Sequence, residues 1–86
     1  MGVVQVNGEV IVYTSKGCPY CEQVIAFLHE HRMKVDERNI SENEGHFSEW
    51  KSINPIGTPL TLYGEHQVIG FHKKNLQSIV EEHVGK

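Results

Sequence analysis

The sequence predicts an α/β protein with the element order β-α-β-α-β-β-α, in which helices flank a four-stranded mixed sheet. Three observations support this class: a short apolar run near the N-terminus, three segments with apolar residues at helical spacing, and two short strands joined by a tight turn. The first half of the order requires a right-handed parallel crossover, and the second half an antiparallel pair. A mixed sheet with helices on both faces accommodates every element.

The first strand and helix are predicted from the segment that follows residue 9. Val10–Tyr13 is an almost continuous apolar run, which is typical of a strand buried on both faces. Pro19 suits the first turn of a helix, because its missing N–H would have no partner there. Helical spacing then continues to about Arg32, with apolar residues at Cys21, Val24, Ile25 and Leu28.

The middle of the chain predicts an edge strand and a second helix. Val35–Ile40 is charged and alternates only weakly, as is typical of a strand at the edge of a sheet. Ser41 and Glu44 have the spacing of a capping box, which predicts that a helix begins here. This helix ends at Asn54-Pro55, and its apolar residues are Phe47, Trp50 and Ile53.

The last third of the chain predicts a hairpin followed by a helix. Leu60–Tyr63 and Gln67–Gly70 are the two strands, and Gly64-Glu65 is the turn between them. The final helix is predicted from an apolar stripe formed by Leu76, Ile79, Val80 and Val84.

Length and charge narrow the possible classes of protein. The 86 residues predict one domain spanning 1–86, with residues 1–8 as a loosely held extension. The net charge of −3 gives no indication of the positively charged surface that is typical of nucleic-acid-binding proteins. The sequence contains no apolar run of the ~20 residues that span a bilayer and no secretory signal. We therefore expect a cytoplasmic monomer that binds neither nucleic acid nor membrane.

The segment Cys18-Pro19-Tyr20-Cys21 carries the sharpest chemical signal. It follows the buried strand and opens a helix, so Cys18 lies at a helix N-terminus, where free N–H groups and the dipole stabilise a thiolate. Cys21 follows one turn later and lies further inside. The sequence therefore predicts that Cys18 attacks a disulfide and that Cys21 resolves the resulting mixed disulfide. Lys16 either adds a positive charge to this site or is simply solvated.

Other functions of the cysteine pair stay open at this point. A zinc site is not predicted, since the sequence has neither a second cysteine pair nor a His-x3–5-His partner. Two chains would instead be able to share an iron–sulfur cluster through Cys18 and a thiol ligand. A docking module without catalysis would use Tyr20 and the edge at Thr58. A disulfide oxidant is a third alternative, although it would require export.

Thr58-Pro59 is the second local signal, at the entry to the hairpin. A proline in this position either starts the strand or forms a cis peptide bond. A cis bond would turn the chain sharply and leave the backbone of Thr58 free to pair with an extended substrate. The residues alone leave both interpretations open.

These motifs together resemble a glutaredoxin of the thioredoxin fold, from about Glu9 to Glu82. The resemblance rests on the Cys-Pro-Tyr-Cys segment after the apolar strand, the Thr58-Pro59 step, and Gly70-Phe71 before the last helix. It implies that Pro59 is cis and packs beside the cysteine pair. The implied groove for glutathione or a substrate thiol is bordered by Lys16, Pro19, Tyr20, Thr58, Gly70 and Phe71.

The resemblance also implies an activity. A small dithiol oxidoreductase of this kind reduces protein disulfides or glutathione-mixed disulfides. It holds no bound cofactor and uses glutathione or a related low-molecular-weight thiol as co-substrate. Its partners are disulfide-containing proteins, and its reductant is glutathione or thioredoxin reductase.

Two segments depart from the usual glutaredoxin pattern. Gly57-Thr58-Pro59 stands where Thr-Val-Pro is common, and Gly70-Phe71-His72-Lys73 stands where Gly-Gly precedes an acidic pair that fixes the glutathione amino group. Gly-Phe is similar instead to redoxins that donate electrons to ribonucleotide reductase and are recharged by thioredoxin reductase. In either case, we expect the N–H groups and cations at Phe71–Lys74 to bind a carboxylate of glutathione or a related thiol.

Overall fold

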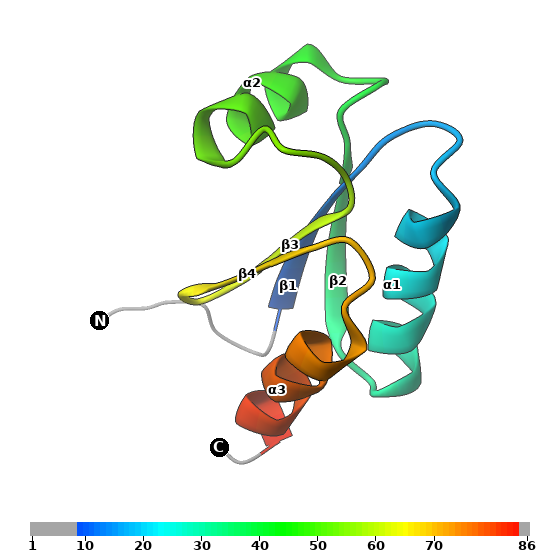
Figure 1. Ribbon diagram of the computed structural model, residues 1–86, viewed down its shortest axis with the longest axis vertical. Helices are drawn as coiled ribbons and strands as arrows, with labels where there is room; N and C mark the ends of the chain where they lie inside the picture. The colour runs from blue at the N-terminus through cyan, green and yellow to red at the C-terminus, as the bar shows by residue number, and fades with distance from the viewer. Residues whose placement is uncertain (1–8, 85–86) are drawn as a thin grey trace.

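The computed structural model describes residues 9–84 and confirms the predicted order of elements (Figure 1). The predicted N-terminal extension, residues 1–8, lies outside the described residues. Along the chain, the elements are β1 (Glu9–Thr14), α1 (Pro19–Glu30), β2 (Lys34–Asn39), α2 (Glu44–Ile53), β3 (Leu60–Tyr63), β4 (His66–Ile69) and α3 (Lys73–Val84).

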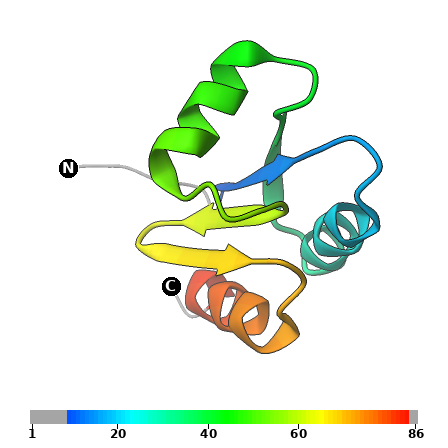
Figure 2. The same cartoon turned by 45° about the horizontal axis from the view of Figure 1, so that its top comes forward.

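The four strands form one mixed sheet in the order β2-β1-β3-β4. β1 runs parallel to β2 and antiparallel to β3, and β3 runs antiparallel to β4. The charged strand β2 is at an edge, as its composition predicts, and the apolar strand β1 is internal. Helices α1 and α3 cover one face of the sheet, while α2 lies over the other (Figure 2).

The hydrophobic core lies between the sheet and the two helices α1 and α3. Val10 and Val12 of β1 are fully buried in this layer, as is Leu28 of α1. Burying one such side chain contributes about 1.5–3 kcal/mol, so this layer anchors α1 on the strand that precedes it. The other core residues are Val24, Phe27, Met33, Val68, Leu76, Ile79 and Val80.

Helix α2 is attached to the opposite face mainly through polar contacts. None of its residues is buried, and Phe47 and Ile53 are 42% and 41% exposed. The Tyr13 hydroxyl donates to Glu49 Oε1 at 2.9 Å, and Arg38 donates to the same oxygen at 2.8 Å. The apolar residues predicted for this helix therefore do not build a second core, because α2 packs beside the polar edge strand.

The capping box predicted for α2 is wrong. Asn43 caps this helix, because its side-chain oxygen accepts the His46 N–H at 3.0 Å. The Ser41 hydroxyl instead accepts the backbone N–H of Lys16 at 3.0 Å. Other boundaries shift slightly: α1 ends at Glu30 rather than near Arg32, whose φ is 61°. β2 spans Lys34–Asn39 rather than Val35–Ile40, and β4 spans His66–Ile69 rather than Gln67–Gly70.

Within the described part of the chain, no helix has the length and apolar character that crossing a bilayer requires.

Candidate redox site

Cys18 is the N-cap residue of α1, as the sequence predicts. Its φ and ψ are −99° and 104°, and its side chain makes no capping hydrogen bond. Pro19 is the first residue of the helix, and the Cys21 N–H donates to the Cys18 carbonyl at 3.2 Å. The Cys18 sulfur is therefore held at the positive end of α1 without being committed to capping it.

The two cysteines are free thiols with different exposure. Cys18 is half-buried, whereas Cys21 is only 4% exposed and lies on the inner side of α1. A sulfur at the surface can meet the disulfide of another molecule, whereas a buried one is limited to reacting with its neighbour. The structure thus places the two thiols as their predicted roles require.

The surroundings lower the pKa of Cys18 below the ordinary value for a thiol. Burial by itself would raise the pKa, but hydrogen bonds to the sulfur outweigh it. They come from the side chain and then the backbone N–H of Cys21, followed by the Thr58 side chain and the Tyr20 N–H. Such donors favour the thiolate, the form that attacks disulfides.

The surroundings raise the pKa of Cys21 to about 11. Burial is the main cause, and both the hydrogen bond to Cys18 and the repulsion from its charge act in the same direction. The Ser15 N–H and the Thr58 side chain oppose these effects. The inner thiol therefore holds its proton more tightly than the outer one.

The loop before β3 lies directly against Cys18. The Thr58–Pro59 peptide bond is cis, as the resemblance implies, and Pro59 is buried. The Cys18 sulfur is 3.7 Å from the Thr58 carbonyl oxygen. Residues that are 40 positions apart in the sequence are thus neighbours at the reacting sulfur.

Two backbone contacts hold this loop in place. The indole N–H of Trp50 donates to the Gly57 carbonyl at 3.1 Å, and the Gly70 N–H donates to the Pro59 carbonyl at 2.9 Å. The first contact ties the loop to α2 and the second ties it to the end of β4. The position of Thr58 beside the sulfur therefore depends on elements on both sides of the loop.

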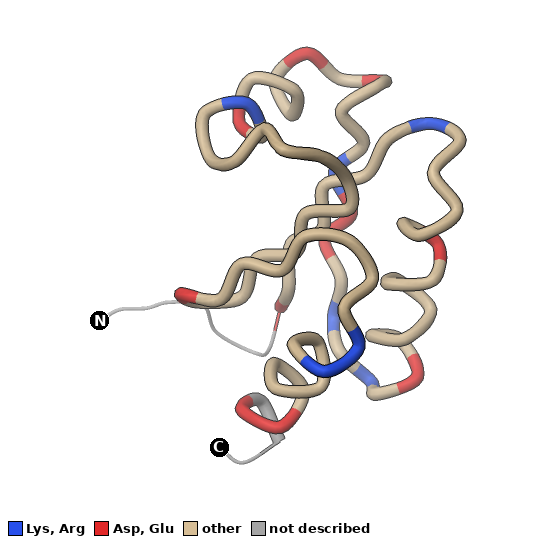
Figure 3. The backbone as a smooth tube through the Cα atoms, in the orientation of Figure 1, with Lys and Arg blue, Asp and Glu red and all other residues tan. Residues whose placement is uncertain are grey.

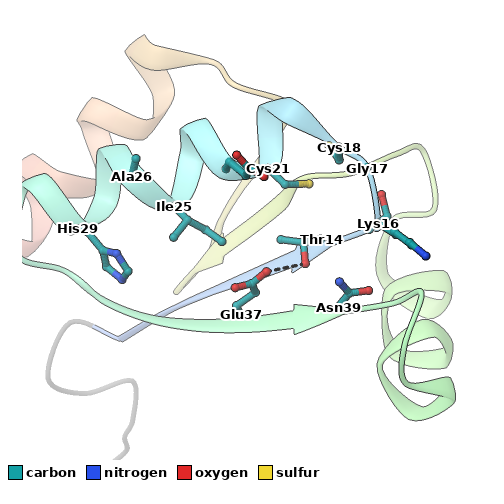
Figure 4. A pocket seen from close by; sticks show the side chains of 12 residues that line it. Thr14, Lys16, Gly17, Cys18, Cys21, Ile25, Ala26, His29, Glu37 and Asn39 are labelled. Atoms are coloured by element: carbon teal, nitrogen blue, oxygen red, sulfur yellow. Dashed lines mark hydrogen bonds between the residues drawn. The ribbon is translucent and has the colours of Figure 1, made fainter.

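The remaining predicted site residues differ in how they face the cysteines. Tyr20 is 56% exposed beside the pair and is available for contact with another molecule. Lys16 is exposed, and its side chain points away from the Cys21 sulfur (Figure 4). The ring of Phe71 is half-buried and packs edge-on against Phe27, with centroids 6.2 Å apart.

The start of α3 is basic, as the sequence indicates (Figure 3). Lys73 and Lys74 are exposed, and His72 accepts the Asn75 N–H at 3.4 Å in the manner of a helix cap. Backbone N–H groups and cations are thus grouped at this helix end, immediately after Gly70-Phe71.

A cleft of about 460 Å³ runs between α1 and the strands β1 and β2 (Figure 4). Both cysteines line it, together with Glu37, whose carboxylate accepts the Thr14 hydroxyl at 3.0 Å. Among residues 9–84, no group of three or more His, Cys, Asp or Glu side chains is arranged to hold a metal ion.

Sequence reasoning missed two residues at the site, Ser15 and Trp50. The Ser15 hydroxyl is 2.6 Å from the Thr58 hydroxyl, and Trp50 holds the same loop through Gly57. Ser15 carried a weak signal as a polar residue directly after a buried strand. The sequence predicts Trp50 only as an apolar residue of the second helix, and nothing in its local pattern indicates a role for the indole N–H.

A free dithiol at the first turn of α1, opposed by a cis-proline loop on a β2-β1-β3-β4 sheet, defines a thioredoxin-fold redox protein. A model of the glutaredoxin family matches residues 10–61, so the chain belongs to the glutaredoxin family.

Solved structures with low sequence identity share the fold. The NrdH-redoxin of Escherichia coli, described as a glutaredoxin-like protein with a thioredoxin-like activity profile, superposes with a TM-score of 0.74 at 13% identity, covering 81% of this chain and 92% of its own. The thioredoxin-like protein BC3987 gives 0.75 at 24% identity, covering 81% and 97%. A glutaredoxin of Archaeoglobus fulgidus gives 0.70 at 21% identity, covering 87% and 88%. The predicted thioredoxin fold is confirmed.

A curated relative is longer than this chain. The global transcriptional regulator Spx 2 of Bacillus cereus is 34% identical over 70 residues, which cover 81% of this chain and 50% of the relative. The chain thus spans about half the length of that protein.

Proposed function

We propose that the protein is a thiol–disulfide oxidoreductase in which Cys18 is the attacking thiol and Cys21 the resolving thiol. The observation that carries this proposal is the opposite effect of the surroundings on the two sulfurs. The outer, half-buried thiol has a lowered pKa, and the inner, buried thiol has a raised one.

The reaction transfers two electrons from the dithiol to a disulfide. The Cys18 thiolate attacks one sulfur of the substrate disulfide, forms a mixed disulfide and releases the other substrate sulfur as a thiolate, which takes up a proton. Cys21 then loses its proton and attacks the Cys18 sulfur. The Cys18–Cys21 disulfide forms, and the second substrate thiol leaves.

The surface around Cys18 supports disulfide-containing proteins as substrates. Tyr20, in the first turn of α1, is 56% exposed, and Ile56, three residues before the cis-proline, is 73% exposed. Exposed apolar side chains beside a reactive sulfur suit a polypeptide that buries them on contact. We propose that the protein acts in this way as a monomer in the cytoplasm, where a reduced dithiol is maintained.

Two routes for recharging the dithiol have structural support. The Gly70-Phe71-His72-Lys73 segment contains no acidic pair to fix a glutathione amino group, and its Gly-Phe step is similar to that of redoxins recharged by thioredoxin reductase, which favours that route. The exposed Lys73 and Lys74 at the start of α3 favour a carboxylate of glutathione or a related thiol as co-substrate. An electron donor to ribonucleotide reductase would use the first route.

The test follows turnover of the oxidised protein with each reductant. We expect reduction either by glutathione with its reductase or by NADPH with thioredoxin reductase, and we expect Cys18→Ser to abolish it with both. The faster couple identifies the physiological route. If glutathione is used, Lys73→Glu with Lys74→Glu should weaken its binding, whereas the single charge reversal Lys51→Glu on α2 should not. An oxidised pair that neither couple reduces would overturn the proposal.

A further inference from the structure

Ser15 and Thr58 join the two loops that enclose the sulfurs. Ser15 follows β1 and Thr58 precedes the cis-proline, and their hydroxyl oxygens are 2.6 Å apart although 43 positions separate them in the sequence. Both residues are half-buried. The reaction proposed above assigns no role to Ser15.

A hydroxyl pair of this kind controls where one proton points. Each hydroxyl has a single proton to donate and is also able to accept. When Ser15 donates to Thr58, the Thr58 proton is left available for a third partner. When Thr58 donates to Ser15, that proton is used up within the pair. The direction of this hydrogen bond therefore decides whether the Thr58 hydroxyl is able to donate to a sulfur.

The Thr58 segment lies against the cysteine pair, since the Cys18 sulfur is 3.7 Å from the Thr58 carbonyl oxygen. Hydrogen bonding by the Thr58 side chain acts to lower the pKa of Cys18 and also that of Cys21. With a single proton, the hydroxyl is able to donate to one sulfur at a time. The backbone N–H of Ser15 also donates toward Cys21. Ser15 thus contacts the inner sulfur through its backbone and the shared donor Thr58 through its side chain.

The negative charge changes position during the reaction. In the reduced protein Cys18 ionises before Cys21, so the charge is carried by Cys18. Once Cys18 is bonded to a substrate sulfur it carries no charge, and Cys21 has to ionise before it attacks. A donor that reaches both sulfurs is able to follow this charge without any movement of the backbone.

We propose that Ser15 is a positioning residue: its hydroxyl donates to Thr58 and so directs the Thr58 proton first to Cys18 and then, in the mixed disulfide, to Cys21. This inference rests on the proposed function. The proton that Cys21 loses goes to solvent, while the Thr58 proton stays on its oxygen and serves only as a hydrogen-bond donor. The bonds that form and break are those of the disulfide exchange described above.

The test uses an aromatic disulfide, dithiobis(nitrobenzoate), because each molecule reports both steps. Attack by Cys18 releases one coloured thiolate, and attack by Cys21 on the mixed disulfide releases the second. Stopped-flow absorbance over a range of pH gives the pKa of Cys18 from the first phase and the rate of resolution from the second. The variants are Ser15→Ala, Thr58→Val and Thr58→Ser.

We expect Thr58→Val to raise the pKa of Cys18 by about one unit and to slow the second phase about tenfold, since a hydrogen bond to a charged group is lost. Ser15→Ala should raise the pKa of Cys18 by about half a unit and slow the second phase about threefold, since the hydrogen bond is weakened rather than lost. Thr58→Ser retains the hydroxyl and should behave like the wild type. Thr61→Val is the matched control, because it removes a buried hydroxyl on β3 and should leave both phases unchanged.

Two results would overturn this inference. One is a Ser15→Ala variant with the pKa and the second phase of the wild type. The other is a Thr58→Ser variant that behaves like Thr58→Val, since the hydroxyl would then not be the active feature. Neither result affects the proposed function, which fails instead if the wild-type protein releases no second thiolate.

Discussion

Cys18 and Cys21 lie one helical turn apart at the start of α1, and yet they differ in exposure, in hydrogen-bond partners and in pKa. Cys18 is the half-buried N-cap residue, and its side chain is not used for capping, while Cys21 is buried on the inner side of the helix. Hydrogen-bond donors gather around the outer sulfur and lower its pKa, whereas burial raises the pKa of the inner one to about 11. The reactivity of a cysteine pair is therefore set by where the fold places each sulfur.

The contrast depends on two parts of the molecule that differ in how they are held. The α1 side is fixed by the buried core, in which Val24 and Leu28 are fully inaccessible. The Thr58 side is fixed by the hydrogen bonds that the loop shares with Trp50, Ser15 and Gly70. Helix α1, which is held by the buried core, thus carries the thiols. The loop at Thr58, which is held by polar contacts, influences their pKa values.

The largest expected effect comes from removing one sulfur at a time. Cys18→Ser should lower disulfide reduction at least about a hundredfold, because serine is not ionised and cannot form the mixed disulfide. Cys21→Ser should still attack and should then accumulate the mixed disulfide, since only the resolving thiol is lost. Intact-mass spectrometry after mixing with a small disulfide measures both.

The reverse pattern would contradict the roles that we assign to the two sulfurs. If Cys21→Ser failed to form a mixed disulfide while Cys18→Ser formed one, the inner sulfur would be the nucleophile. Digestion of the trapped species and fragmentation of the peptide identify which cysteine carries the adduct.

A smaller effect is expected from loosening the loop opposite the thiols. Trp50→Phe retains an aromatic ring but loses the N–H that holds the Gly57 carbonyl. We expect a loss of about 1 kcal/mol in the free energy of unfolding and a rise of a few tenths of a unit in the pKa of Cys18. Urea unfolding and pH-dependent alkylation provide the two measurements.

Phe47→Leu is the matched control for this variant. Phe47 is on the same helix, contacts the ring of Trp50 and is 42% exposed. Its replacement should leave the pKa of Cys18 unchanged. Equal shifts in the two variants would show that packing of α2, rather than the indole N–H, determines the effect.

The smallest expected effect comes from Thr61→Val, which should change the stability of the fold without changing the reactivity of either cysteine. The Thr61 hydroxyl is buried without a hydrogen-bond partner among residues 9–84, opposite Val12 and Val68 in the sheet. Thr61→Val should stabilise the protein by about 1 kcal/mol and leave both thiols unchanged. Thermal unfolding checks the first expectation, and an unchanged alkylation profile checks the second. A destabilised variant would indicate a partner for this hydroxyl.

Much of the arrangement around α1 was predictable from the sequence, because the relevant signals are local. Val10–Tyr13 indicates an internal strand, Pro19 marks the first turn of the helix, and the spacing of the cysteines places one outside and one inside. The cis bond at Pro59 was implied by the family resemblance, while the residues alone left it open.

The features that sequence reasoning missed depend on tertiary contacts. Ser41 and Asn43 are both residue types that cap helices, but Asn43 caps α2, and the Ser41 hydroxyl accepts the distant Lys16 N–H instead. The pairing of Ser15 with Thr58 joins residues 43 positions apart. No periodicity or capping rule carries information over that distance.

The most direct test of the account is an NMR titration of the reduced protein with ¹³C-labelled cysteine, which follows each sulfur separately. The account predicts that Cys18 ionises below the ordinary range for a thiol and Cys21 near pH 11. The rate of attack on a disulfide should then fall as the pH drops through the lower midpoint, because the thiolate becomes protonated. Two cysteines that titrate together at the ordinary value, or a Cys21 that ionises before Cys18, would contradict it.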